Sequence, residues 1–362
     1  MSEFYKLQVA EVLPETDTAV EVVLDIPAAL RPAFAFTQGQ YLTLRQMLDG
    51  DEVRRSYSIC SAVGDGRLSI GIRRVEGGRF STFANTALKQ GDTIEVMPPQ
   101  GTFFTPLRPH EQRRFLCIAA GSGITPILSI IKTTLLEEPE SEVTLIYGNQ
   151  RTNTMMFREP LSDLKNRFLD RFQWINIMSR EEHGADLLSG RINNKKGAQL
   201  QAAGLIDIKS YDHYFLCGPE AMISEVSRGL RAEGVDESVI HYELFGASAA
   251  AAAEAVEKHH QRAERFAGVT SAVSVVKGGR TIRMDVSADG ENILDAAMGA
   301  GADLPYSCKG GVCATCKAKL VKGEVEMDLT HGLEPDEIEA GFILTCQSHP
   351  VSAEVVVDFD QR

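Results

Sequence analysis

Four cysteines near the carboxyl end have the spacing of a metal-cluster site. Three of them follow the pattern C-x4-C-x2-C and the fourth stands thirty positions later; they are Cys308, Cys313, Cys316 and Cys346. This pattern predicts a [2Fe–2S] cluster, because two irons and two sulfides need four thiolates, and three can come from one tight loop. A tight loop around a cluster requires small residues, and Gly310, Gly311 and Ala314 are of this kind. Backbone N–H groups of the loop could then donate hydrogen bonds to the sulfurs.

A structural zinc site is the alternative for these cysteines. Zinc sites usually combine two short C-x-x-C pairs, whereas this chain has one such pair and a fourth cysteine standing alone. The spacing therefore favours iron–sulfur. The chain has seven cysteines in all, including Cys60, Cys117 and Cys217. An odd number argues against a disulfide framework.

A glycine pair after an apolar run forms a second candidate site. Residues 115–120 are suited to a buried parallel strand, and Gly121 and Gly123 follow directly, ahead of Thr125 and Pro126. Two glycines permit a tight turn and the close approach of a phosphate, and proline suits a first helical turn. The third glycine of the G-x-G-x-x-G fingerprint is missing. Taken alone, this pattern is only a weak signal for a dinucleotide site.

The elements around these sites suggest a multidomain chain. Short alternating apolar strands over residues 1–108 predict an antiparallel β-barrel. Residues 109–246 alternate strand and helix, which is typical of a doubly wound α/β domain. Residues 247–270 are alanine-rich and poor in apolar bulk, so we expect a linker, partly helical. Residues 271–362 form a small α+β module that holds the four cysteines.

Charge and hydropathy narrow the function classes. The net charge is −13, which argues against nucleic-acid binding on electrostatic grounds. From Ser271 onward there are 8 Lys and Arg against 15 Asp and Glu, an acidic module that could steer a basic partner or simply aid solubility. No apolar run approaches the roughly 20 residues of a membrane span. The amino-terminal residues lack the features of a signal peptide, so we expect a cytoplasmic protein.

The order of parts resembles the reductases of multicomponent oxygenases, in which a ferredoxin–NADP reductase module is fused to a plant-type [2Fe–2S] ferredoxin of β-grasp fold. The resemblance is closest to the reductase family of phenylacetyl-CoA epoxidases. Besides the cysteine loop with its flanking residues from Ala302 to Cys316, four segments carry it: Arg55-Ser56-Tyr57-Ser58-Ile59-Cys60, Ala120-Gly121-Ser122-Gly123-Ile124-Thr125-Pro126, Met155-Met156-Phe157-Arg158 and the tail Val355-Val356-Val357-Asp358-Phe359-Asp360-Gln361. A further segment, Leu216-Cys217-Gly218-Pro219, resembles the C-G-P segment of the wider ferredoxin–NADP reductase family. The resemblance implies FAD, NADPH and a [2Fe–2S] cluster as cofactors, and a di-iron oxygenase as partner in aerobic phenylacetate degradation.

The resemblance also implies roles for individual residues. Arg55, Ser56, Tyr57 and Ser58 would bind the flavin, with the arginine toward phosphate and the tyrosine on the ring. The segment with Gly78, Ser81 and Thr82 would hold the pyrophosphate, which favours FAD over FMN. Gly218 and Pro219 would border the nicotinamide. The residues expected close to the hydride path are Cys217, Glu243 and Phe245.

The choice of nicotinamide cofactor rests on residues after a predicted strand at 174–178. Ser179 and Arg180 resemble the pair that NADP-using relatives place at the 2′-phosphate, and so favour NADPH. An NAD enzyme would more often show an acidic residue there, and Glu181 and Glu182 keep that alternative open.

Two functional alternatives remain. The chain could serve another hydroxylase, such as a steroid or aromatic-ring system, or it could be a [2Fe–2S] redox sensor. The cofactors favour electron transfer, because a flavin can stand between a two-electron donor and a one-electron acceptor. A single Glu257-Lys-His-His260 sequence is not enough for a di-iron site, which needs such pairs on two helices and further carboxylates. The oxygenase is therefore expected to be a separate protein.

Overall fold

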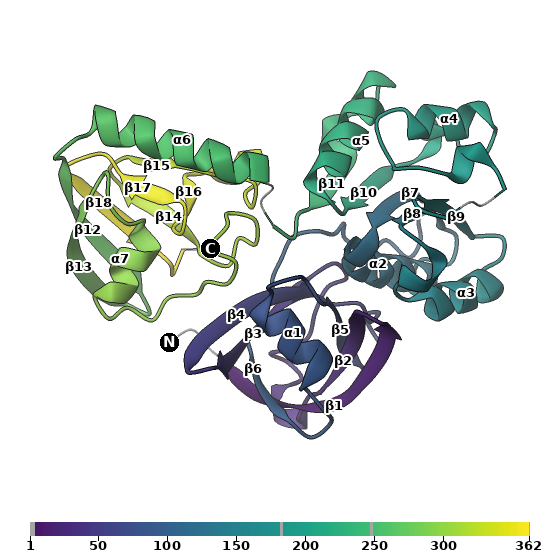
Figure 1. Ribbon diagram of the computed structural model, residues 1–362, viewed down its shortest axis with the longest axis horizontal. Coiled ribbons are helices and arrows are strands. Elements are labelled where there is room, and N and C mark those ends of the chain that lie inside the picture. The colour runs from purple at the N-terminus through teal and green to yellow at the C-terminus, as the bar shows by residue number, and fades with distance from the viewer. Residues whose placement is uncertain (1–3, 182–183, 247–248, 362) are drawn as a thin grey trace. The chain divides into compact units, whose positions relative to one another are not determined.

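The computed structural model describes residues 4–181, 184–246 and 249–361. Contacts divide the chain into two compact units (Figure 1), Phe4–Glu243 and the carboxyl-terminal Leu244–Arg362. None of the helices in the described ranges has the length and apolar character needed to cross a membrane.

The first unit begins with an antiparallel barrel. Its elements are β1 (Tyr5–Thr16), β2 (Ala19–Asp25), β3 (Tyr41–Leu48), β4 (Asp51–Ser58), β5 (Leu68–Arg73), α1 (Arg79–Thr86) and β6 (Thr93–Val96). The strand order is β4-β3-β6-β1-β2-β5. A bridge between Ile59 and Ile70 joins the ends of this order and closes the barrel. Alternate strand residues fill the interior with aliphatic side chains such as Leu7, Val22 and Leu42.

A five-stranded parallel sheet completes the first unit. Its elements are β7 (Arg114–Ala120), α2 (Ile124–Glu137), β8 (Glu142–Asn149), α3 (Arg158–Arg167), β9 (Phe172–Met178), α4 (Lys196–Ala202), β10 (His213–Cys217), α5 (Glu220–Ala232) and β11 (Ile240–Glu243). The strand order is β11-β10-β7-β8-β9, and helices lie on both faces (Figure 1). The chain moves one way from β7 to β9 and the other way to β10. In such sheets the crevice at the reversal, here between β7 and β10, is where ligands bind.

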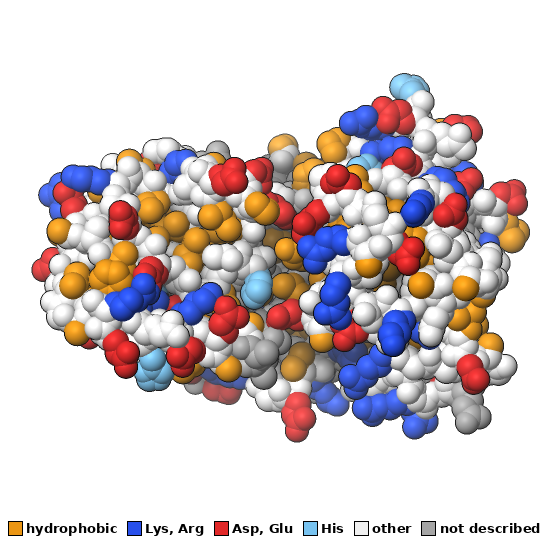
Figure 2. All heavy atoms as spheres, turned by 90° about the horizontal axis from the view of Figure 1, so that it is seen from above, with side chains coloured by type: hydrophobic (Ala, Val, Ile, Leu, Met, Phe, Trp, Pro, Cys, Tyr) orange, Lys and Arg blue, Asp and Glu red, His pale blue; other side chains and the backbone are white. Residues whose placement is uncertain are grey.

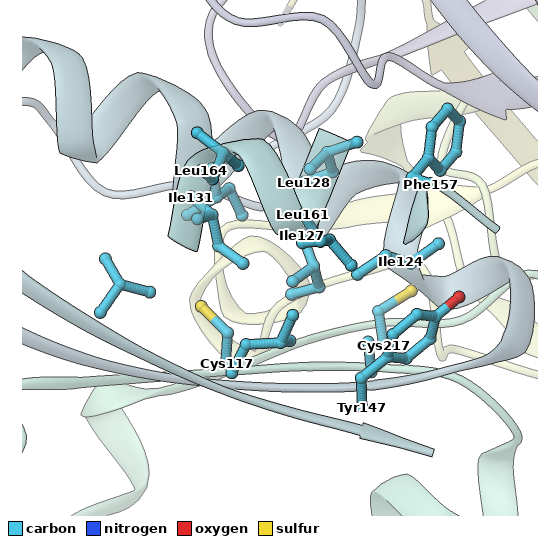
Figure 3. Packing of buried hydrophobic residues seen from close by; sticks show 14 of the residues in the cluster. Cys117, Ile124, Ile127, Leu128, Ile131, Tyr147, Phe157, Leu161, Leu164 and Cys217 are labelled. Carbon is cyan, nitrogen blue, oxygen red and sulfur yellow. The ribbon is translucent and has the colours of Figure 1, made fainter. Parts of the chain in front are cut away.

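One apolar core joins the barrel to the parallel sheet. Helix α2 packs Ile124, Ile127 and Ile131 toward Cys117 and Tyr147 of the sheet, as Figure 3 shows. The same cluster includes Ala19, Cys60 and Phe103 from the barrel region. Each fully buried aliphatic side chain contributes about 1.5–3 kcal/mol, so this shared core holds the two halves of the unit in a fixed arrangement.

The carboxyl-terminal unit has a mixed sheet and a long helix. Its elements are α6 (Ala249–Arg265), β12 (Thr270–Lys277), β13 (Arg280–Ser287), α7 (Ile293–Gly299), β14 (Lys317–Lys322), β15 (Val325–Met327), α8 (Pro335–Glu339), β16 (Phe342–Leu344), β17 (Ser348–Pro350) and β18 (Glu354–Asp358). The main order is β13-β12-β18-β14-β16, and β15 pairs with β17 separately. Only β12 and β18 are parallel among the described pairs of this sheet. This is the β-grasp arrangement.

Helix α6 occupies most of the segment for which the sequence predicted a linker; residues 247 and 248 of that segment lie outside the described ranges. The helix is fixed by Arg262, whose side chain is 1% exposed. Its Nη1 lies 2.6 Å from Oδ1 of Asp328, and its Nε donates to the carbonyl of Ala288 at 3.1 Å. The other carboxylate oxygen of Asp328 lies 3.1 Å from Nε2 of His349. The helix therefore packs through a charged group, which a search for apolar bulk does not detect.

The surface of the molecule carries both signs of charge. Figure 2 shows Lys and Arg side chains interspersed with Asp and Glu on the face that it presents, with hydrophobic side chains scattered between them. Interspersed charges of this kind keep a protein with a net charge of −13 from presenting one continuous acidic field on that face.

Candidate functional site

Three of the predicted residues meet where the barrel and the parallel sheet join. Ser58 ends β4, Cys217 ends β10 and Glu243 ends β11. Cys217 and Glu243 are paired neighbours in the parallel ladder. The Ser58 hydroxyl donates to Oε2 of Glu243 at 2.9 Å. The carboxyl ends of β10 and β11 and the end of the barrel strand β4 thus bring a thiol, a carboxyl group and a hydroxyl together beside the crevice.

Burial determines the protonation states of Glu243 and Cys217. Loss of solvent raises the pKa of Glu243 to about 7, although the hydrogen bond from Ser58 opposes the rise. Loss of solvent, followed by the nearby Glu243 charge, raises the pKa of the Cys217 thiol well above its usual value. Cys217 is therefore a protonated, buried thiol and no nucleophile. Glu243 can hold or release a proton close to neutral pH.

The glycine loop lies directly against this point. A Cβ at Gly123 would be 2.2 Å from the carbonyl oxygen of Cys217, so only glycine fits. Gly121 has φ +56, the left-handed region that glycine tolerates. Thr125 donates its hydroxyl to the Ser122 carbonyl at 3.0 Å and closes the first turn of α2. The loop and helix start therefore present backbone N–H groups at the crevice, as an anion site requires.

The segment after β10 packs equally closely. A Cβ at Gly218 would be 2.7 Å from Cε of Met222 and 3.1 Å from Cβ of Ala120. Pro219 is the N-cap of α5. The four-residue segment expected at the nicotinamide thus borders the same crevice as the glycine loop.

Two residues of this site were missed by the sequence reasoning. The position of a Gly121 Cβ is 2.8 Å from Nη1 of Arg73, at the end of β5. The Tyr147 hydroxyl donates to the Gly121 carbonyl at 3.0 Å. Arg73 places a guanidinium beside the loop, and Tyr147 fixes the loop from the sheet. The sequence signal for Arg73 was an arginine at the end of an otherwise apolar strand. No sequence signal pointed to Tyr147.

The residues expected at a 2′-phosphate lie at the carboxyl edge of β9. The backbone N–H groups of Ser179 and Arg180 donate to the carbonyls of Asn149 and Gln150, each at 2.9 Å. Both residues are exposed. The carboxylate of Glu181 accepts from the backbone N–H and hydroxyl of Thr152, at 2.7 and 2.8 Å; Glu182 lies outside the described residues. Glu181 thus supports the loop that carries Arg180.

The remaining barrel residues line β4. Arg55 is exposed and donates to the carbonyl of Arg54 at 2.7 Å. The hydroxyl of Ser56 is 3.1 Å from that of Thr43 on the neighbouring strand. The ring of Tyr57 packs 5.6 Å from the ring of Phe80 in α1. The strand and the start of α1 therefore lie on one side of the barrel.

The turn before α1 is organised by Ser81. Its hydroxyl accepts from the N–H of Val75 at 3.1 Å and donates to the carbonyl of Gly78 at 3.3 Å. A Cβ at Gly78 would be 2.5 Å from that hydroxyl oxygen, so a side chain there would displace the Ser81 hydroxyl from the turn. Thr82 is exposed in the first turn of the helix. Ser81 shapes the turn, and the helix start offers its N–H groups.

The four candidate cluster cysteines approach one another in two pairs within the carboxyl-terminal unit. Cys308 and Cys313 shift each other's pKa in opposite directions, and so do Cys346 and Cys316, so the two thiols of each pair lie close together. Among described residues, no three His, Cys, Asp or Glu side chains converge on a point suited to one metal ion. Two pairs of thiols suit two irons, each with two protein ligands. This donor set fits a two-iron cluster better than a single zinc ion, which needs all of its ligands around one point.

Backbone N–H groups point at these sulfurs. The Cys313 thiol, together with N–H groups of the loop such as that of Gly310, lowers the pKa of Cys308 to about 5. The loop reaches this geometry through two non-glycine residues with positive φ, Lys309 and Ala314.

Phe245 belongs to the same unit as the cysteines, and its side chain is 46% exposed.

Comparisons with known proteins agree with this arrangement. The family model of the oxidoreductase FAD-binding domain matches residues 16–104, that of the oxidoreductase NAD-binding domain matches 117–228, and that of the 2Fe-2S iron-sulfur cluster binding domain matches 275–351. A 1,2-phenylacetyl-CoA epoxidase subunit from Escherichia coli is 46% identical, covering 100% of this chain and 99% of the relative. The chain belongs to the family of oxygenase reductases that join these three domains.

Two further proteins match nearly the whole length of the reductase. The ferredoxin reductase component of 3-ketosteroid-9-alpha-monooxygenase from Rhodococcus rhodochrous is 30% identical, covering 98% of the reductase and 96% of the relative. The solved structure of phthalate dioxygenase reductase has a TM-score of 0.60 at 24% identity and covers 98% of both chains, so it supports the fold. The predicted fold class is therefore confirmed.

Family membership defines the reductase in outline. It is an oxidoreductase that binds FAD, a nicotinamide cofactor and a [2Fe–2S] cluster, and it transfers electrons to an oxygenase component.

Proposed function

We propose that this reductase takes electrons from NADPH and delivers them to the di-iron oxygenase that epoxidises phenylacetyl-CoA in aerobic phenylacetate degradation. The observation that carries the proposal is the 46% identity to the Escherichia coli epoxidase subunit, which runs through all three domains. The domains proposed are a flavin domain at 1–108, a nicotinamide domain at 109–246, a connecting segment at 247–270 and a ferredoxin domain at 271–362.

The cofactors supply the redox chemistry: the nicotinamide gives a hydride, FAD exchanges two electrons or one, and the cluster carries one. The chain binds and orients them. We assign Ser58, Cys217 and Glu243 to the place where nicotinamide and flavin rings meet. Glu243, with Ser58 as hydrogen-bond donor, holds a proton there near neutral pH. Cys217 fills the crevice with an uncharged side chain and excludes water. Phe245 is proposed as a further aromatic neighbour of the flavin.

The flavin pyrophosphate is assigned to the start of α1. Gly78 and Ser81 fix the turn, so that backbone N–H groups and the exposed Thr82 are available to an anion. Arg55 and Tyr57 are assigned to a flavin phosphate and the ring. A guanidinium suits phosphate, and an aromatic side chain suits a flat ring.

NADPH is preferred to NADH because of the residues after β9. Arg180 is exposed on a loop that two backbone hydrogen bonds fix to the end of β8. The acidic residue next to it, Glu181, is engaged by Thr152 and so is not directed to a ribose hydroxyl. An exposed guanidinium on a loop whose backbone is held in place favours a 2′-phosphate.

The cluster ligands proposed are those that form the two thiol pairs: Cys308, Cys313, Cys316 and Cys346. None of the seven cysteines, all of which the structure describes, takes part in a disulfide, and Cys60, Cys117 and Cys217 are outside the proposed ligand set. Free thiols persist in a reducing compartment, which supports a cytoplasmic location.

The proposal is tested by reconstitution. The purified reductase is mixed with the oxygenase components of a phenylacetyl-CoA epoxidase, phenylacetyl-CoA and either NADPH or NADH. We expect formation of epoxide product coupled to NADPH oxidation. Product with a steroid hydroxylase and none with the epoxidase would favour the alternative partner class. Slow NADPH:cytochrome c reduction without any oxygenase stimulation would instead indicate a redox sensor.

A further inference from the structure

Gln347 directly follows the fourth cysteine and is 8% exposed. Its Nε2 lies 3.1 Å from the carbonyl of Lys309, 3.0 Å from the carbonyl of Cys346 and 3.6 Å from Sγ of Cys346. All three neighbours are acceptors, so the amide nitrogen, and not its oxygen, must face them. One side chain thus touches both segments that supply cysteines.

The cysteine loop is shaped to receive this amide. Lys309 has φ +51, a left-handed conformation in a non-glycine residue, and its carbonyl accepts from Gln347. A Cβ at Gly311 would lie 3.0 Å from Cγ of Gln347, so the absence of a side chain there makes room for the glutamine. Two segments that lie 38 positions apart in the chain are therefore both shaped to make this contact.

We propose that Gln347 is a positioning residue that ties Cys346 to the cysteine loop and raises the reduction potential of the [2Fe–2S] cluster. The inference rests on the proposed ligand set. Reduction adds negative charge to the cluster and its thiolates, and an N–H dipole directed at a ligand sulfur stabilises the more negative state. Loss of that N–H group therefore lowers the potential.

The test compares full-length variants loaded with FAD and cluster. Gln347→Leu keeps most of the volume and removes both N–H groups. Gln347→Glu keeps the shape and brings negative charge in place of a donor. At a fixed ambient potential, we expect the ratio of reduced to oxidised cluster to fall about fivefold in Gln347→Leu, the effect of one modest hydrogen bond. It should fall further in Gln347→Glu. Redox titration followed by the visible bands of the cluster measures this ratio.

Ser348→Ala is the matched control. Ser348 is the next residue and is fully buried, but its hydroxyl donates to the carbonyl of Leu344 at 2.8 Å. The substitution should lower thermal stability and leave the potential unchanged. A wild-type potential in both Gln347 variants, or an equal shift in Ser348→Ala, would overturn the proposal.

Two further measurements separate this inference from the ligand assignment. Iron and acid-labile sulfide should remain at two each per chain, the content of a [2Fe–2S] cluster, in Gln347→Leu, whereas loss of a true ligand abolishes the cluster. In protein labelled with ¹⁵N at glutamine side chains, pulsed EPR of the reduced cluster should detect a nitrogen coupling that Gln347→Leu lacks. Absence of that coupling in the parent protein would also refute the contact.

Discussion

The hydroxyl of Ser58 donates a 2.9 Å hydrogen bond to Oε2 of Glu243, although the two residues are 185 positions apart. Ser58 is the last residue of a barrel strand, and Glu243 is the last residue of β11 in the parallel sheet. Because the two halves share one core, this bond is held by the packing of the whole unit. It gives a fixed place to a carboxyl group that titrates near pH 7.

The first prediction concerns pH. The pKa of Glu243 is raised from 4.5 to about 7, so the folded state binds this proton more tightly than the unfolded chain. The resulting stability is fully present below pH 4.5 and is lost as pH rises through 7. Glu243→Gln should therefore be more stable than the parent protein at pH 8, by about 1–2 kcal/mol after allowance for the remaining exposure of the side chain. Urea unfolding at about pH 5 and about pH 8 measures the difference.

The same pair predicts a pH profile of activity. NADPH:ferricyanide reduction should change with an inflection near pH 7 in the parent protein, and Glu243→Gln should lack that inflection. Ser58→Ala removes the hydrogen bond that lowers the pKa, so its inflection should move to higher pH. An inflection at the same pH in all three proteins would remove Glu243 from the reaction.

The second prediction concerns the cluster. Cys313→Ser should lose the visible bands of the [2Fe–2S] cluster and the ability to reduce the oxygenase, because serine is a poor ligand for iron in such a site. Ferricyanide reduction through the flavin should be retained, since the barrel and the parallel sheet form a separate unit. Cys60→Ser, a change at a buried thiol of the barrel, should keep the bands. Simultaneous loss of all activities in Cys313→Ser would contradict the modular assignment.

The third prediction concerns the nicotinamide. Arg180→Ala should raise the KM for NADPH by about tenfold or more and leave that for NADH nearly unchanged, because only NADPH carries a phosphate for the guanidinium. Steady-state ferricyanide assays with both cofactors give the two values. Arg167→Ala, at the end of α3, serves as a control for loss of positive charge alone. Equal effects on the two cofactors would exclude Arg180 from the 2′-phosphate site.

The fourth prediction concerns helix α6. Arg262→Leu removes the buried guanidinium that pairs with Asp328 and leaves the carboxylate with its His349 contact, at a cost of about 3 kcal/mol. Arg265→Ala, one turn later, breaks only the exposed pair with Glu326 and should cost less than about 1 kcal/mol. Thermal unfolding of the full-length protein, followed at the cluster bands, separates them. Similar transition temperatures for the two variants would show that Arg262 does not anchor the helix.

Much of the fold and site followed from local signals. The cysteine spacing, the glycine pair after a buried strand and the change from alternating strands to strand–helix repeats are all encoded within short windows. The family resemblance, and not these windows, implied Ser58, Cys217 and Glu243, and the structure brings these three residues together.

The features that were missed depend on contacts between distant segments. Arg73 becomes relevant only because β5 ends beside the Gly121 loop. The sequence named Glu181, but the hydrogen bond that it accepts from Thr152 joins residues 29 positions apart. Arg262 lies in a stretch with little apolar bulk, and its burial depends on Asp328, 66 positions away. The periodic pattern of apolar residues in a sequence does not indicate which charged residues pair in the folded protein.

The anchoring of α6 by Arg262 matters for anyone who wishes to move this electron carrier into another enzyme. The match to the cluster-binding family begins at residue 275, and a fusion made there would discard the arginine while keeping Asp328 and His349. Such a chimera would keep the half-buried carboxylate of Asp328 without the guanidinium that pairs with it. A graft that starts ahead of Ala249 would keep Arg262 together with Asp328 and His349.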